Sequence, residues 1–331
     1  MSTQTAQPRS PRLFAATIGL IAGASTIAAV FLVGEEYGCV LFLGAPLVLG
    51  LVSTLALAMQ AEHDAGTMHS TAQMALGVGL LWLLLLGLEG LICLAMAYPL
   101  AAPVTALGVV LGRLLARPRP PRAAHVALLV ALSPLLVAFD GLTPDPPLRE
   151  VETVVEIDAP PEVVWPLVVA FAELPPPADL AFRLGIAYPI RARIEGEGVG
   201  AVRYCEFSTG PFVEPITRWE APHRLSFDVV AQPPTMHELS PWGDIAPRHL
   251  TESLHSERGE FRLVALPGGR TRLEGSTWYR HELAPGLYWN LWSDALIHRI
   301  HRRVLHSIAA RAEESATLPA DALRAADTQR R

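Results

Sequence analysis

The feature that most constrains this chain is a series of long, uncharged apolar runs in its first 139 residues. A helix that crosses a bilayer needs ~20 consecutive apolar residues, and the first two runs each have 21 residues without a charge. The third run is interrupted only by Glu89, and the last two are shorter. In chain order the runs lie at 13–33, 39–59, 74–97, 100–115 and 123–139. We therefore predict a transmembrane domain of about five spans over residues 1–139, with the lipid bilayer as its partner.

The arginines predict how these spans are oriented. Arg9 and Arg12 precede the first run, and four more arginines, at 113–122, lie at the end of the fourth run and between it and the fifth. The positive-inside rule places both groups in the cytoplasm. A fifth span then puts the rest of the chain on the outer (periplasmic) face of the cell membrane, whereas loss of either weak span would leave it in the cytoplasm. The first run is long and is followed by further runs, which favours an uncleaved anchor over a signal peptide.

Charge and cysteine content exclude several functions. The net charge of −6 argues against a nucleic-acid partner, which would require a basic face. The three cysteines show no paired spacing, so neither a disulfide framework nor a cysteine metal site is predicted. No cofactor motif is present. Glu89 is a functional candidate, because a carboxylate inside a span is costly; the alternative is a protonated acid that simply hydrogen-bonds to its neighbours.

The second half of the chain has the pattern of a separate α+β domain. Residues 140–150 are rich in Pro and predict a linker, and 151–157 predict a strand from their β-branched content. A helix-start signal follows at 158–171. A run of strands then extends to residue 282 and includes a hairpin turn at 266–270. A long helix from about 285 to 313 closes the domain, and 313–331 predict a polar tail.

The segment VVEIDAPPEVVWPLV (154–168), a strand running into a helix that carries a Trp, resembles the signature of the START-like, polyketide-cyclase (SRPBCC) superfamily. The resemblance covers residues 151–312 and the order of their elements. It implies a helix-grip fold, in which a curved antiparallel sheet wraps around the long C-terminal helix. It also implies an apolar cavity that carries lipids or other hydrophobic ligands and that supports cyclisation or dehydration in some members. The resemblance transfers no catalytic residues.

The long helix carries Asp294, His298 and His301 at spacings of four and three residues, which suits either a metal site or a solvated helix face. On a helical projection the apolar stripe faces the predicted cavity and the trio lies away from its centre. No second shell for a metal is visible. We therefore predict no metal site. We expect this face, which also carries Leu291 and Leu305, to contact the membrane domain or a second copy of the chain.

The stretch 233–250 is long for a connection between strands and is rich in groups that can act as acids and bases. His237, Glu238 and His249 are its candidate catalytic residues. The alternative is a proline-stiffened loop whose polar groups cap its own backbone.

For the cavity wall we expect Tyr279, Tyr288, Trp289 and Trp292, with Arg203 gripping an anionic head group. The same aromatic residues would equally make an ordinary core. Arg203 would equally form a cross-strand ion pair on the wet face of the sheet.

Three functions remain open on the sequence. The first is a membrane-anchored helix-grip domain that binds a hydrophobic or lipid-like small molecule. The second is a cyclase- or dehydratase-type enzyme that uses the 233–250 loop for acid–base catalysis. The third is a protein-interaction module whose cavity is filled by its own side chains.

Overall fold

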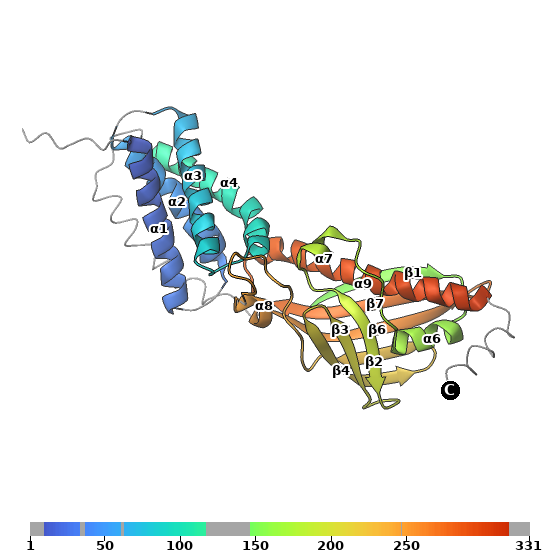
Figure 1. The fold of residues 1–331 in the computed structure, drawn as a ribbon. Coiled ribbons are helices and arrows are strands. Elements are labelled where there is room, and N and C mark those ends of the chain that lie inside the picture. The colour runs from blue at the N-terminus through green and yellow to red at the C-terminus, as the bar shows by residue number, and fades with distance from the viewer. Residues whose placement is uncertain (1–9, 34–36, 61–62, 117–145, 246, 318–331) are drawn as a thin grey trace, which may run out of the picture. The chain divides into compact units, whose positions relative to one another are not determined.

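The computed structural model describes residues 10–33, 37–60, 63–116, 146–245 and 247–317. It divides the chain into two compact units (Figure 1). One, here called the helical unit, contains the described part of residues 1–145 together with 238–247 and 282–289. The other, the sheet unit, contains 146–237, 248–281 and the described residues from 290 onward. The sequence prediction divided the chain only once, at 140–150, and did not anticipate the two segments from the second half that belong to the helical unit.

Four long apolar helices form the body of the helical unit, and each is long enough to cross a membrane. They are α1 (Pro11–Val33), α2 (Ala45–Ala58) with the short π-helix η1 (Val40–Gly44) that leads into it, α3 (Ala65–Leu85) and α4 (Leu91–Ala116). Most side chains of α2 are buried against the other helices. Large apolar side chains on α1, α3 and α4 stay exposed, including Phe14, Trp82 and Leu107. The predicted span at 123–139 lies outside the described residues.

The predicted third span is divided by a turn. Residues 74–97 include the end of α3, the turn at 86–90 and the start of α4, so Glu89 lies in the turn and not inside a helix. Gly87 in this turn has φ +68°, a backbone conformation that glycine adopts without strain. A hydropathy average misses such a turn because the leucines on both sides of it are equally apolar.

The sheet unit is a seven-stranded antiparallel sheet in the order β1-β7-β6-β5-β4-β3-β2. Its strands are β1 (Arg149–Ile157), β2 (Pro189–Glu195), β3 (Val202–Phe207), β4 (Gly210–Glu220), β5 (Arg224–Asp228), β6 (Leu254–Leu266) and β7 (Arg270–His281). Its helices are α6 (Pro161–Val169), α7 (Leu180–Leu184), α8 (His249–Glu252) and the long α9 (Gly286–Thr317), which begins in the helical unit. The predicted strands, hairpin turn and final helix are all present; the short helices α7 and α8 were not predicted.

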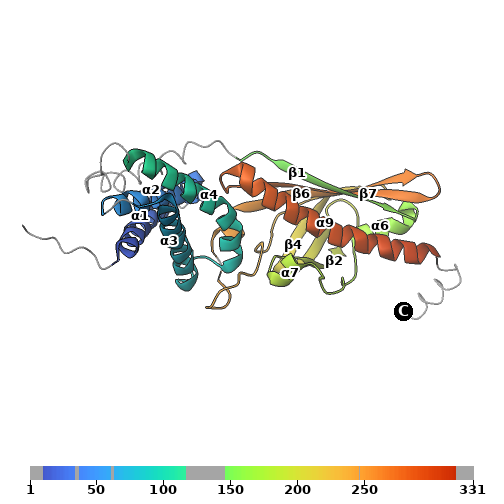
Figure 2. The ribbon, with the colours of Figure 1, turned by 90° about the horizontal axis from the view of Figure 1, so that it is seen from above.

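The core of the sheet unit lies between the sheet and its helices. Figure 2 shows α9 extending along the sheet, and its buried apolar residues beyond Trp289 lie on one face of the helix: Ile297, Val304, Leu305, Ile308 and Ala312. All but Ile297 share one core cluster with Val164, Trp165 and Val168 of α6 and with buried strand residues. This packing curls the sheet around α9 and leaves a space beside the middle of the helix.

Candidate functional site

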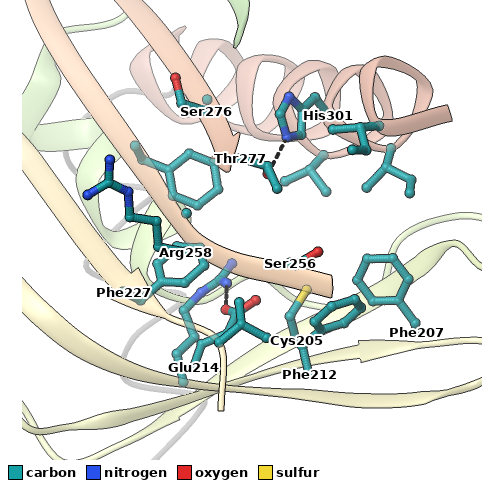
Figure 3. A pocket seen from close by; sticks show the side chains of 18 of the residues that line it. Cys205, Phe207, Phe212, Glu214, Phe227, Ser256, Arg258, Ser276, Thr277 and His301 are labelled. Atoms are coloured by element: carbon teal, nitrogen blue, oxygen red, sulfur yellow. Dashed lines mark hydrogen bonds and ion pairs between the residues drawn. The ribbon is translucent and has the colours of Figure 1, made fainter. Parts of the chain in front are cut away.

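A cavity of about 110 Å³ lies between the sheet and α9 in the sheet unit (Figure 3). Its walls are mostly apolar, and the residues that supply them are Phe207, Phe212, Phe227, Val229, Phe261, Ile297, Ile300, Val304 and Leu305. Its polar lining comes from the side chains of Arg203, Cys205, Glu214, Ser256, Arg258, Ser276, Thr277 and His301. An apolar space with a few polar groups is the usual form of a small-molecule site.

The floor of the cavity is a buried ion pair. Arg203 on β3 and Glu214 on β4 are directly paired across the two strands, and their side chains are only 1% and 7% exposed. Arg203 Nη1 donates to the Glu214 carboxylate, and Nε donates to the Val169 carbonyl at 3.2 Å. The Nη2 group is buried and has no hydrogen-bond partner among the described residues. Burial disfavours the ionised carboxylate and raises the pKa of Glu214, while the charge of Arg203 acts in the opposite direction.

Aromatic rings surround this guanidinium. The Arg203 Cζ atom lies 5.3 to 5.7 Å from the ring centroids of Phe171, Phe227 and Phe261. Such contacts stabilise the buried cation. The Phe227 ring has room because Gly259 is its partner on β6, where a Cβ atom would come within 2.5 Å of the ring. Cys205 is also part of the floor; burial, reinforced by Glu214, raises the pKa of its thiol to about 12, so it does not act as a nucleophile near neutral pH.

A chain of hydrogen bonds joins the opposite wall to β1. The Thr277 Oγ1 atom lies 2.8 Å from Nε2 of His301, and Figure 3 shows this pair facing the cavity across from Glu214 and Cys205. His301 Nδ1 lies 3.1 Å from Thr153 Oγ1, and the same hydroxyl lies 2.8 Å from His298 Nδ1. Burial, together with the neighbouring His298, lowers the pKa of His301 to about 4, so its ring is neutral near pH 7.

The structure therefore places the predicted histidine trio differently from the helical projection. His301 lines the cavity, and Leu305, assigned to the same outer face, is fully buried. The projection failed because it counted Trp292 and Leu296, which are only half-buried, toward the centre of the apolar stripe. Asp294 belongs to another group, in which it accepts from Tyr279 Oη at 2.6 Å and from Arg149 Nη2 at 2.7 Å. Among the described residues, Asp294, His298 and His301 do not form a cluster that could hold a metal ion.

Of the five predicted cavity residues, only Arg203 lines the cavity. Tyr279 is fully buried beside Asp294, and burial raises its pKa to about 12. Tyr288 and Trp289 belong to the helical unit, where Tyr288 Oη donates to the Met96 carbonyl. The Trp289 ring lies 4.8 Å from the ring of Phe42. Trp292 on α9 is half-buried and is not part of the lining.

The candidate residues of the 233–250 stretch have separate contacts. Glu238 belongs to the helical unit, where its carboxylate accepts from the backbone N–H groups of Ile92 (3.0 Å) and Cys93 (2.9 Å) at the start of α4. His237 Nε2 lies 3.1 Å from the Ser208 carbonyl in the sheet unit. His249 begins the short helix α8, and burial lowers its pKa to about 4.

Glu89 lies near the same end of α4 within the helical unit. The Tyr37 hydroxyl donates to its Oε1 atom at 3.0 Å. Burial raises the pKa of Glu89 to about 7, against the opposing effect of this hydrogen bond. The carboxyl group is therefore engaged in the turn that joins α3 to α4.

Sequence reasoning missed Glu214, Thr153, Thr277 and the phenylalanine wall. A signal for part of this set was present, because Arg203, Cys205 and Phe207 alternate on one face of β3, and Phe212 and Glu214 alternate in the same way on β4. The sequence did not reveal which face of these strands is concave. Knowing that the hairpin pairs Arg203 with Glu214 would have identified the floor of the cavity.

No protein-family model and no curated protein sequence matches this chain. Solved structures that it resembles include the Zhui aromatase/cyclase from Streptomyces sp. R1128, with 18% identity, a TM-score of 0.32, and coverage of 50% of this chain and 94% of that one. Norcoclaurine synthase from Thalictrum flavum has 12% identity, a TM-score of 0.34, and coverage of 54% and 98%. The Aha1 dimer from Colwellia psychrerythraea has 13% identity, a TM-score of 0.31, and coverage of 50% and 96%.

The strand order and the long C-terminal helix, described above, define the fold. The sheet unit therefore has a helix-grip fold, in which a curved antiparallel sheet wraps around a long C-terminal helix.

Proposed function

We propose that the sheet unit binds one small ring-containing molecule that carries a hydrogen-bond-accepting oxygen, and that the helical unit anchors it to a membrane. The observation that carries this proposal is the Nη2 group of Arg203. A buried donor without a partner costs ~1–3 kcal/mol, and more when the group is charged. A ligand oxygen placed against Nη2 removes that cost, while the phenylalanine wall accepts the apolar part of the ligand.

The cavity volume supports a ligand of about one ring. Drug-sized ligands occupy sites of about 300–1,000 Å³, whereas an engineered cavity of about 150 Å³ in another protein binds benzene. At about 110 Å³ this cavity fits a substituted aromatic ring only closely, and it is too small for a lipid acyl chain unless its walls move. Among the hydrophobic or lipid-like small molecules expected from the sequence, we therefore favour a small aromatic or cyclic ligand over a lipid.

The proposed membrane attachment rests on the helical unit. Four of its helices have the length and hydropathy of spans. Large side chains such as Leu13, Trp82 and Leu114 are about half or more exposed, which suits contact with lipid rather than water. The face of the membrane on which the sheet unit lies depends on 117–145, outside the described residues.

The binding proposal is tested with benzamide and toluene, which share one ring but differ in the carbonyl oxygen. Isothermal titration uses the full-length protein in nanodiscs. We expect benzamide to bind at least about tenfold more tightly than toluene, because a hydrogen bond to a charged group contributes ~1.5–3 kcal/mol.

The variant R203M/E214M replaces both members of the ion pair and leaves no unpaired charge. It should abolish the preference for benzamide. The exposed Arg218, which pairs with Glu220 and is 46% exposed, supplies the control R218M, which should retain the preference. Equal binding of benzamide and toluene by the wild type would overturn the proposal.

A further inference from the structure

The hydrogen-bond chain Thr277–His301–Thr153–His298 leads from the cavity wall to a second histidine on α9. All four residues belong to the sheet unit. Thr277 and His301 line the cavity, whereas Thr153 and His298 do not. Thr153 is buried on β1, and the Nε2 atom of half-buried His298 makes no hydrogen bond with the part of the chain that the structure describes. The chain therefore has one end in the cavity and one end at His298.

This arrangement can hold one additional proton on His301 without moving a heavy atom. A threonine hydroxyl accepts one hydrogen bond while donating another. If His301 is charged, its Nδ1–H donates to Thr153, whose hydroxyl donates to His298 Nδ1. Its Nε2–H donates to Thr277, whose own hydrogen then points elsewhere. Both ring nitrogens of the cation are satisfied, and so is Nδ1 of His298.

The charges around the cavity explain why such a proton would be needed. Arg203 and Glu214 neutralise each other, Arg258 stacks on Trp278 at the cavity edge, and neutral His301 completes the lining. The other charged groups beside the chain, Arg149 and Asp294, pair with each other and with Tyr279. An anionic ligand would thus meet Arg258 as the one cation of the described lining without a carboxylate partner. A further positive charge on His301 would offset the cost of burying the negative charge.

We propose that this cavity accepts a small anion, such as an aromatic carboxylate, together with one proton that is taken up on His301 through the Thr153–His298 chain. The inference rests on the proposed function and names its ligand class. An opposite charge within 4–6 Å raises the pKa of a basic group by about 1–3 units. Starting from about 4, this is enough to bring the pKa of His301 close to neutrality when an anion is bound.

The test compares benzoate with benzamide, which has the same shape but no charge, in the full-length protein between pH 5.5 and 8.5. Benzoate is ionised throughout this range. Uptake of one proton on His301 makes the Kd of benzoate rise by up to about tenfold per pH unit below the pKa that His301 has in the complex, and the Kd levels off above that pKa. The Kd of benzamide should not change with pH.

Two variants locate the proton. In H301Q the pH dependence for benzoate should disappear. In T153V it should weaken, because the charged ring loses the acceptor for Nδ1–H. The exposed His306 on the same helix supplies the control H306Q, which should behave like the wild type.

Three results would overturn the inference. A benzoate Kd independent of pH in the wild type would do so while leaving the benzamide preference, and with it the proposed function, intact. An undiminished slope in H301Q would place the proton on another group of the site, such as Glu214 or the ligand. If benzamide and toluene also bind equally, the proposed function fails and the inference fails with it.

Discussion

Removing Glu214 alone should destabilise the sheet unit far more than removing the whole ion pair. In E214L, Arg203 stays 1% exposed and charged; Nη1 loses its partner, Nη2 already lacks one, and Nε keeps only the Val169 carbonyl. Breaking a buried pair from one side costs ~3–5 kcal/mol, whereas replacing both members by apolar residues is often neutral or stabilising. We therefore expect E214L to lose about 3 kcal/mol or more and R203M/E214L to stay within about 1 kcal/mol of the wild type.

Hydrogen-exchange mass spectrometry on the full-length protein in nanodiscs measures this difference, because it reports the opening free energy of β3 and β4 separately from that of the helical unit. The control is E206Q on β3, the strand that pairs with β4. Glu206 pairs with Arg191, which is 53% exposed, and such surface pairs contribute ~0–1 kcal/mol. The reasoning is refuted if E214L costs no more than E206Q, or if the double variant is as unstable as the single one.

Three further predictions concern other parts of the chain. The pKa of His301 is about 4 in the folded protein, against an ordinary value of 6.5. The neutral ring therefore contributes its full stabilisation above pH 6.5, and this contribution is lost as the pH falls through 4. The free energy of unfolding of the sheet unit should fall by up to ~3 kcal/mol between pH 7 and pH 4, and by less in H301Q. The G259V variant adds a Cβ atom within 2.5 Å of the Phe227 ring and should push that ring into the cavity. Benzamide binding, measured by titration, should then be lost in G259V and retained in A265V on the same strand. E238A should uncap α4, so that hydrogen exchange at Ile92 and Cys93 accelerates by an amount corresponding to about 1 kcal/mol, whereas E257A leaves it unchanged.

The elements that sequence reasoning predicted well have a local signal. The strands of the sheet unit follow β-branched alternation, the β6–β7 turn follows its glycines, and α9 follows a helical period. Two of the apolar runs, 13–33 and 39–59, correspond closely to α1 and to η1 with α2, because in these the run and the helix end together. These features depend on neighbouring residues alone.

The features that could not be predicted depend on residues far apart in the sequence. The floor of the cavity exists because β3 and β4 pair Arg203 with Glu214 on the concave side. The hydrogen bonds of His301 join Thr153 and Thr277, which come from strands more than a hundred residues apart in the chain. His301 faces the cavity because the buried face of α9 is centred on Ile297 and Val304. Glu238 caps a helix that begins at Leu91, which no local pattern reveals.

The most direct test of the central claim is a structure of the full-length protein with 4-bromobenzamide, in which the anomalous signal of bromine locates the ligand. We expect bromine among the phenylalanine side chains of the cavity, with the amide oxygen within hydrogen-bond distance of Arg203 Nη2. A cavity closed by its own side chains, or bromine bound only elsewhere on the protein, would contradict it.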